Sequence, residues 1–132
     1  MQNYEIGGDN KIKSFTDLNA HKEAHKLVLL IYEITKEFPK EERFCLIDQI
    51  RRAAVSIVSN IAEGFSRNTT KDKCQFYSLA LGSLSELQSQ LLIAKDLKYL
   101  NQQIFNQIAQ QSIVVRKLIS GLKRIKYQNE KI

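Results

Sequence analysis

Apolar residues recur every three or four positions through most of the chain, and this spacing predicts helices. The first segment shows the pattern at Ala20, Ala24, Leu27, Val28, Ile31, Ile34 and Phe38. The four predicted helices cover residues 17–38, 41–65, 70–97 and 102–126. We therefore expect one folded domain, residues 15–126, between a flexible N-terminal tail, residues 1–14, and a C-terminal tail, residues 127–132.

Short breaks separate the four segments. Pro39 follows the first, and Gly64 is placed to end the second. Thr69 or Thr70 offers an N-cap for the third helix. Because short connections make successive helices antiparallel neighbours, we predict an all-α fold, an antiparallel up-down-up-down four-helix bundle.

The second and third helices carry more apolar surface than one core needs. A bundle helix requires an apolar stripe somewhat over 100° wide, whereas the second helix is apolar over about 200°. On the third helix, leucines and an isoleucine bracket a stripe of small residues: Ser78, Gly82, Ser85 and Ser89. We predict that this stripe lies in the interface of a homo-oligomer. The alternative is a monomer whose extra apolar sides face water.

The same two helices carry a polar motif, which comprises Arg51, Arg52, Asn60, Glu63 and Glu86. Arg51 falls inside the apolar arc of its helix, where a guanidinium needs a carboxylate or carbonyl partner. Glu86 on the third helix is a candidate partner for Arg51 or Arg52.

The chain has 132 residues and a formal net charge of +6, which favours a polyanionic partner such as RNA or DNA. The basic residues that we select for nucleic-acid contact lie on the fourth helix, opposite its apolar face: Arg116, Lys117, Lys123 and Arg124. A solvated basic face that contacts no partner is an equal alternative.

No motif for catalysis, a cofactor or a metal is evident, so we expect a protein without enzymatic activity, cofactor or bound metal. His21 and His25 are four residues apart, but Glu23 does not complete the HExxH arrangement of zinc proteases, and we expect a structural or surface role. Cys45 and Cys74 are too few for a disulfide framework. With no signal peptide expected and no apolar run of about 18 residues, we predict a cytoplasmic protein without membrane contact.

Two segments of the sequence resemble a known protein family: "FPKEERFCLIDQIRRAAVSIVSNIAEGFSR" and "FYSLALGSLSELQSQLLIAKDLKYL". They resemble a bacterial family usually called four-helix bundle proteins. Its members include proteins encoded by intervening sequences within 23S ribosomal RNA genes and the accessory variability determinant of diversity-generating retroelements. The resemblance covers residues from about Phe15 to Ile125.

The resemblance implies a bundle that assembles into a homo-oligomeric ring, a homopentamer in the retroelement member. It also implies an adaptor role, in which basic surface binds nucleic acid together with a reverse transcriptase or a ribosomal component. The leading interpretation is therefore a non-enzymatic, homo-oligomeric nucleic-acid-binding or adaptor protein. The alternative is a protein–protein assembly module that makes no contact with nucleic acid.

Overall fold

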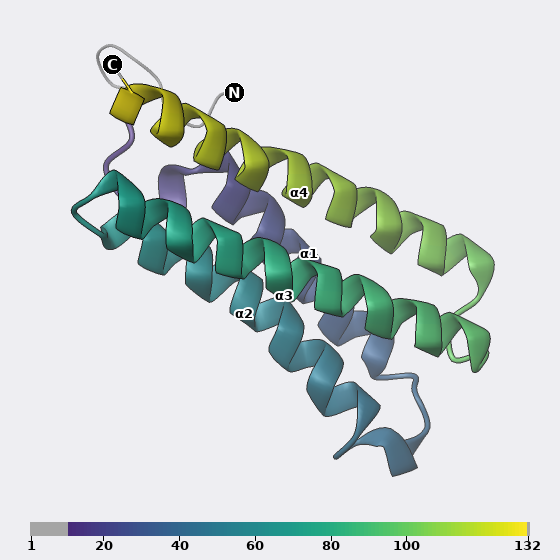
Figure 1. Cartoon of the computed structure of the whole chain (residues 1–132). Helices are drawn as coiled ribbons and strands as arrows, with labels where there is room; N and C mark the ends of the chain where they lie inside the picture. Colours follow the sequence, from purple (N-terminus) through teal and green to yellow (C-terminus); the bar gives the residue numbers. More distant parts are fainter. Residues whose placement is uncertain (1–10, 132) are drawn as a thin grey trace.

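The computed structural model describes residues 11–131, with side chains as far as residue 124, and Figure 1 shows their arrangement. Four α-helices follow one another: α1 (Asn19–Thr35), α2 (Leu46–Ser66), α3 (Thr70–Asp96) and α4 (Gln102–Lys131). Two short 3-10 turns precede α1 and α2: η2 (Phe15–Asp17) and η3 (Lys40–Glu42). Residues 11–131 contain no strand, so the prediction of an all-α protein is confirmed for this part of the chain.

The helices lie side by side around one hydrophobic core (Figure 1). The contact between α2 and α3 is the most extensive, and further contacts join α3 to α4, α1 to α2 and α1 to α4. The core consists mainly of the residues that helical spacing selects, such as Leu27, Ile57, Leu84 and Ile119, none of which is exposed to solvent. Burial of such side chains stabilises the fold by about 1.5–3 kcal/mol each.

Gly64 has a different role from the one that its position in the sequence predicted. We expected it to end the second helix, but α2 continues to Ser66. Gly64 is buried against the side chain of Tyr77 on α3, and a Cβ at this position would lie 2.7 Å from Tyr77 Cε1. The missing side chain therefore allows α2 and α3 to approach each other closely.

Side-chain caps define two of the helix starts. Ser14 and Asp17 form a capping box around η2, in which Asp17 Oδ2 accepts a hydrogen bond from Ser14 N at 3.1 Å. α1 begins at Asn19, two residues after the predicted start, and its N-cap residue Leu18 forms no side-chain capping hydrogen bond. At α3, Thr69 Oγ1 accepts a hydrogen bond from Asp72 N at 3.1 Å, so Thr69, one of the two predicted candidates, is the N-cap.

The predicted start of the second helix at Glu41 is wrong. Residues 40–42 form the separate turn η3, and the backbone of Cys45, with φ −123° and ψ −101°, is not helical. The Glu42 side chain contacts the start of α2, where its Oε1 accepts a hydrogen bond from Leu46 N at 3.3 Å. Its Oε2 also accepts one from Tyr99 Oη at 2.8 Å, which ties η3 to the connection between α3 and α4.

The remaining boundaries differ by a few residues from those predicted. α1 ends at Thr35 rather than Phe38, and α4 continues beyond Lys126 to Lys131. The predicted C-terminal tail is therefore helical through Lys131, while residues 1–10 and Ile132 lie outside the described part of the chain. Among the described residues, no helix is long and apolar enough to cross a membrane.

Candidate nucleic-acid surface

Three of the four basic residues selected from the sequence, Arg116, Lys123 and Arg124, lie along the contact between α3 and α4, here called the α3–α4 seam. Arg116 is half-buried in the seam, and its Nη2 donates hydrogen bonds to Ser85 Oγ at 3.0 Å and Gln88 Oε1 at 2.9 Å. Both acceptors are neutral, so these contacts fix the guanidinium without neutralising its charge. Arg116 thus has a defined position beside α3, whereas the sequence placed it on the side of the fourth helix opposite the apolar face.

Lys123 and Arg124 lie at the end of the seam where α3 begins, whereas Lys117 directly follows Arg116 on the exposed surface of α4. Lys123 is half-buried, and Lys117 and Arg124 are exposed. Cys74 Sγ donates a weak hydrogen bond to the Lys123 carbonyl oxygen at 3.8 Å. Within the described residues, none of these three basic residues forms an ion pair.

A hollow opens at this end of the seam, with a volume of about 370 Å³. We call it the α3–α4 hollow, and its lining is Cys74, Leu81, Ser120, Lys123 and Arg124. The exposed lining is mostly apolar, while the two basic residues contribute charge. The arrangement combines a hydrophobic recess with cations that can pair with an anion.

The charge of the described residues is unevenly distributed along the helices. At the end that holds the α2–α3 connection, basic residues outnumber carboxylates; they are Lys11, Lys13, Lys22, Arg67, Lys71, Lys73, Lys117, Lys123 and Arg124. The carboxylates at this end are Asp17, Glu23, Glu63 and Asp72. At the opposite end, carboxylates and basic residues nearly balance, so the α3–α4 hollow lies in the more positive half.

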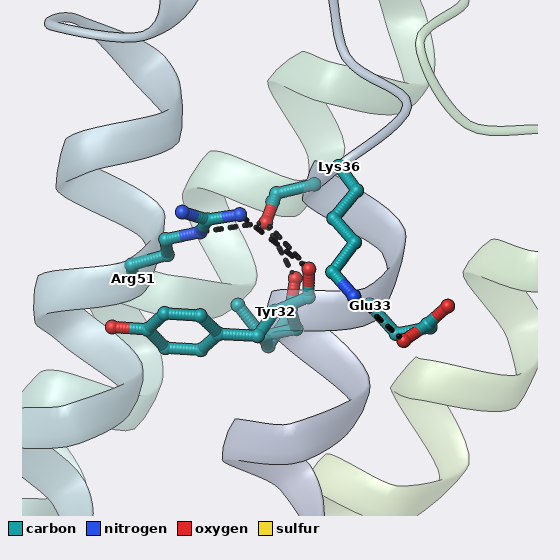
Figure 2. A network of polar contacts seen from close by, with 6 residues as sticks. Tyr32, Glu33, Lys36 and Arg51 are labelled. Carbon is teal, nitrogen blue, oxygen red and sulfur yellow. Dashed lines mark hydrogen bonds and ion pairs between the residues drawn. The ribbon is translucent and has the colours of Figure 1, made fainter.

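Arg51 of the polar motif does not pair with Glu86, the partner considered from the sequence. Figure 2 shows its side chain extending to the last turn of α1. Arg51 Nε donates to Thr35 Oγ1 at 2.8 Å, Nη2 lies 3.5 Å from the Tyr32 carbonyl oxygen, and the guanidinium stacks 4.5 Å from the Tyr32 ring centre. A cation beside the C-terminal carbonyls of α1 is favoured by the helix dipole, so Arg51 joins α2 to α1.

The remaining motif residues form contacts within and between helices. Asn60 Nδ2 donates to Ser56 Oγ at 3.1 Å, and the Ser56 and Ser83 hydroxyl groups lie 2.7 Å apart across the α2–α3 contact. Glu63 pairs with Arg67, and Glu86 accepts a bond from Gln90. Arg52 is exposed, without an ion pair in the described part of the chain. Of the motif residues, Arg51 therefore contacts a neighbouring helix, whereas Asn60, Glu63 and Glu86 contact residues within four positions in the chain.

The predicted interface stripe lies on the outward face of α3. Ser78, Gly82, Ser85 and Ser89 are all exposed, and a Cβ added to Gly82 would meet no atom within 4 Å. Exposed apolar residues flank the stripe on both sides, as the sequence indicated; they are Leu79, Leu92, Ile93 and Leu97. The seam lies beside this face, since Ser85 of the stripe is bonded to Arg116.

His21 and His25 lie next to each other on α1, with ring centres 6.3 Å apart, and His21 also contacts the Phe15 ring. Burial and the neighbouring His25 lower the pKa of His21. No group of three or more potential metal ligands occurs among the described residues. Cys45 and Cys74 are both free thiols.

Sequence reasoning missed several polar residues that hold these surfaces in place. Thr35, Gln90 and Ser112 are buried, although helical spacing marks such positions for apolar residues. Gln88 links the seam, because Nε2 donates to Ser112 Oγ at 3.1 Å while Oε1 accepts from Arg116. In the sequence, these residues are recognisable as polar residues at core positions of the helical pattern. That pattern does not reveal which groups their side chains bind.

Comparisons with known proteins agree with this architecture. The chain is similar to a solved structure of a protein with unknown function from the S23 ribosomal protein family of Bacteroides thetaiotaomicron. The TM-score is 0.73 at 21% sequence identity, over 79% of this chain and 97% of that chain, and at this identity the likeness concerns the fold. None of the curated proteins compared matches the chain. The model of the family described as "23S rRNA-intervening sequence protein" matches residues 16–121, and the chain therefore belongs to that family.

Proposed function

We propose that this protein is a non-enzymatic nucleic-acid-binding adaptor that works as a homo-oligomer. The observation that carries the proposal is the set of basic residues along the α3–α4 seam, which form no ion pair within the described residues. Cations that lack carboxylate partners are available to phosphates, and each phosphate contact releases counterions from the nucleic acid.

Assembly is the second part of the proposal. Each chain would form an up-down-up-down bundle, and copies would join through the outward face of α3 into a ring, with a pentamer favoured by the resemblance described above. The supporting observation is that Leu79 and Leu97 are each 50% exposed beside the small-residue stripe. Apolar residues grouped around an open stripe are typical of a surface that another protein covers.

Binding to RNA and DNA at increasing salt concentrations tests the nucleic-acid part. We expect the logarithm of the affinity to fall linearly with the logarithm of the salt concentration. A variant in which Gln replaces four basic residues at once should bind more weakly and show a flatter slope; the four are Arg116, Lys117, Lys123 and Arg124. The matched control replaces Lys36, Lys40, Lys95 and Lys98, at the opposite end of the helices, with Gln and removes the same charge.

A wild-type protein that binds neither RNA nor DNA at low salt would contradict the nucleic-acid part of the proposal. Equal losses of affinity in the seam variant and in the control would exclude the seam from the proposal, because net charge alone would then explain the binding.

A protein–protein assembly module is the second candidate function, and the exposed apolar face of α3 favours it. In that case a reverse transcriptase or a ribosomal protein would contact the chain directly. A complex reconstituted from purified components that survives nuclease treatment, and that the seam variant still forms, would support this candidate over the first.

A further inference from the structure

We propose that the α3–α4 hollow holds an unpaired base of a single-stranded nucleic acid, with neighbouring phosphates on Lys123 and Arg124. The inference deepens the proposed function and rests on it, because it assigns one part of the seam a defined ligand. The residues concerned come from two helices: Cys74 and Leu81 from α3, and Ser120, Lys123 and Arg124 from α4.

The size and lining of the hollow fit a flat aromatic ligand. Its volume of about 370 Å³ leaves room for a flat ring that stays partly open to solvent. Leu81 and Cys74 supply apolar surface from α3, while the carbon stems of Lys123 and Arg124 can add more from α4. Every nucleobase presents an apolar face, and a guanidinium such as that of Arg124 can stack on it.

Charge complementarity selects a nucleotide over an uncharged aromatic compound. Lys123 and Arg124 stand at the hollow and form no ion pair among the described residues. Arg116 precedes Ser120 by one helical turn, and neutral groups hold its guanidinium in the seam. These cations therefore extend along one line, which suits the repeated phosphates of a nucleic-acid strand better than an isolated anion.

The position of the hollow favours a single strand. Its lining comes from α3 and α4, and Leu81 is half-buried between the two helices. Bases in a duplex are stacked and paired, whereas unpaired bases can turn outward and stack on protein side chains. A duplex can reach the outer cations Lys117 and Arg124 with its phosphates, but it cannot place a base against Leu81.

The two cysteines provide a direct test with an internal control. Cys74 lines the hollow, while Cys45 is exposed at the start of α2, at the opposite end of the bundle. Peptide mass spectrometry measures the rate at which each thiol of the full chain is alkylated. The rates are compared in three conditions: without nucleic acid, at saturation with an unstructured RNA oligonucleotide, and at saturation with an RNA duplex. We expect the single strand to slow alkylation of Cys74 and to leave Cys45 unchanged, and we expect the duplex to protect Cys74 far less.

Unchanged alkylation of Cys74 in the saturated single-strand complex would overturn the inference, and so would equal protection by the duplex. Both results would leave the proposed function standing, because they require that nucleic acid binds. By contrast, a protein that binds no oligonucleotide at low salt would overturn the proposed function together with the inference.

A variant that fills the hollow gives a second readout. Ser120→Phe should lower affinity for the single strand by about tenfold, the size of one lost stacking contact, and leave the salt slope unchanged because no charge is removed. Gln110→Phe, at an exposed position of α4, is the matched control. Circular dichroism confirms that both variants fold, and normal affinity of a folded Ser120→Phe variant would contradict the inference.

Discussion

At Gly64, the ring of Tyr77 leaves no space for a side chain. Gly64→Ala should lower the free energy of unfolding by about 1–3 kcal/mol, because the new Cβ forces the ring or a helix to move. Urea denaturation measures the effect. The control is Gly121→Ala, where the nearest atom to an added Cβ is the flexible end of Arg124 at 3.9 Å. Equal stability of the two variants would show that α2 and α3 do not meet closely at Gly64.

The buried hydroxyl group of Tyr77 has no hydrogen-bond partner among the described residues. Burial, with a smaller contribution from Cys74, raises the pKa of Tyr77 from 10.0 to about 12. The neutral phenol is therefore favoured in the folded protein, and its contribution to stability is complete below pH 10. That contribution is lost as the pH rises from 10 to about 12, because the unfolded chain loses the proton first.

Tyr77→Phe tests this assignment. We expect unchanged or higher stability at pH 7, since an unpaired buried hydroxyl group is removed. Between pH 10 and 12 the variant should lose less stability than the wild type. Chemical denaturation across this pH range provides the comparison, and parallel curves for the two proteins would contradict the buried, unpaired state of the phenol.

Arg51 is the polar-motif residue with the clearest packing role. Arg51→Met keeps the aliphatic stem but removes the bonds to Thr35 and the Tyr32 carbonyl, and it should lower the free energy of unfolding by about 1–2 kcal/mol. Arg52→Met, at the neighbouring exposed position, should change stability by less than about 0.5 kcal/mol. If both variants unfold at the same denaturant concentration, Arg51 does not join α1 to α2.

At the scale of elements, Glu42 connects three parts of the chain. Its carboxylate accepts hydrogen bonds from Leu46 N at the start of α2 and from the Tyr99 hydroxyl group. Glu42→Ala should lower the free energy of unfolding by about 1–2 kcal/mol, because both hydrogen bonds to its carboxylate are lost. Glu41→Ala is the control, because Glu41 is exposed and lies in the same turn.

A double-mutant cycle with Tyr99→Phe separates the two bonds of Glu42. Strict additivity of the Glu42 and Tyr99 changes would show that these side chains do not interact. A coupling energy of about 0.5 kcal/mol or more is the result that the hydrogen bond predicts.

The helices and most of their core residues were predictable, because each helix is defined by local spacing. Leu27, Ile57 and Leu84 are buried where the pattern places them, and Thr69 caps α3 as expected. Contacts between elements were not predictable in the same way. Arg51 was assigned to a carboxylate but binds Thr35, and Gly64 was assigned to a helix end but lies against Tyr77.

The candidate site was predictable in its location but not in its geometry. Charge and helical spacing placed the four basic residues on the fourth helix. They could not show that Arg116 is fixed by Ser85 and Gln88, or that Lys123 borders a hollow, because both features depend on the neighbouring helix α3.

At the scale of assembly, we propose that copies of the chain meet through the outward face of α3. Gly82→Leu places a bulky side chain in the open stripe, and it should disrupt assembly while helix content stays the same. Circular dichroism and light scattering measure the two properties. Gln110→Leu on α4 is the control and should leave the mass unchanged. A Gly82→Leu protein with the wild-type mass would exclude the stripe from the interface.

The most direct test of the account is the molar mass of the wild-type protein, measured by light scattering over a wide range of concentrations. We predict a stable multiple of the chain mass, with five copies as the favoured number, because the apolar sides of α3 extend beyond the core of one bundle. A single-chain mass at the highest concentration would contradict the account, since Leu79 and Leu97 would then face water without a partner.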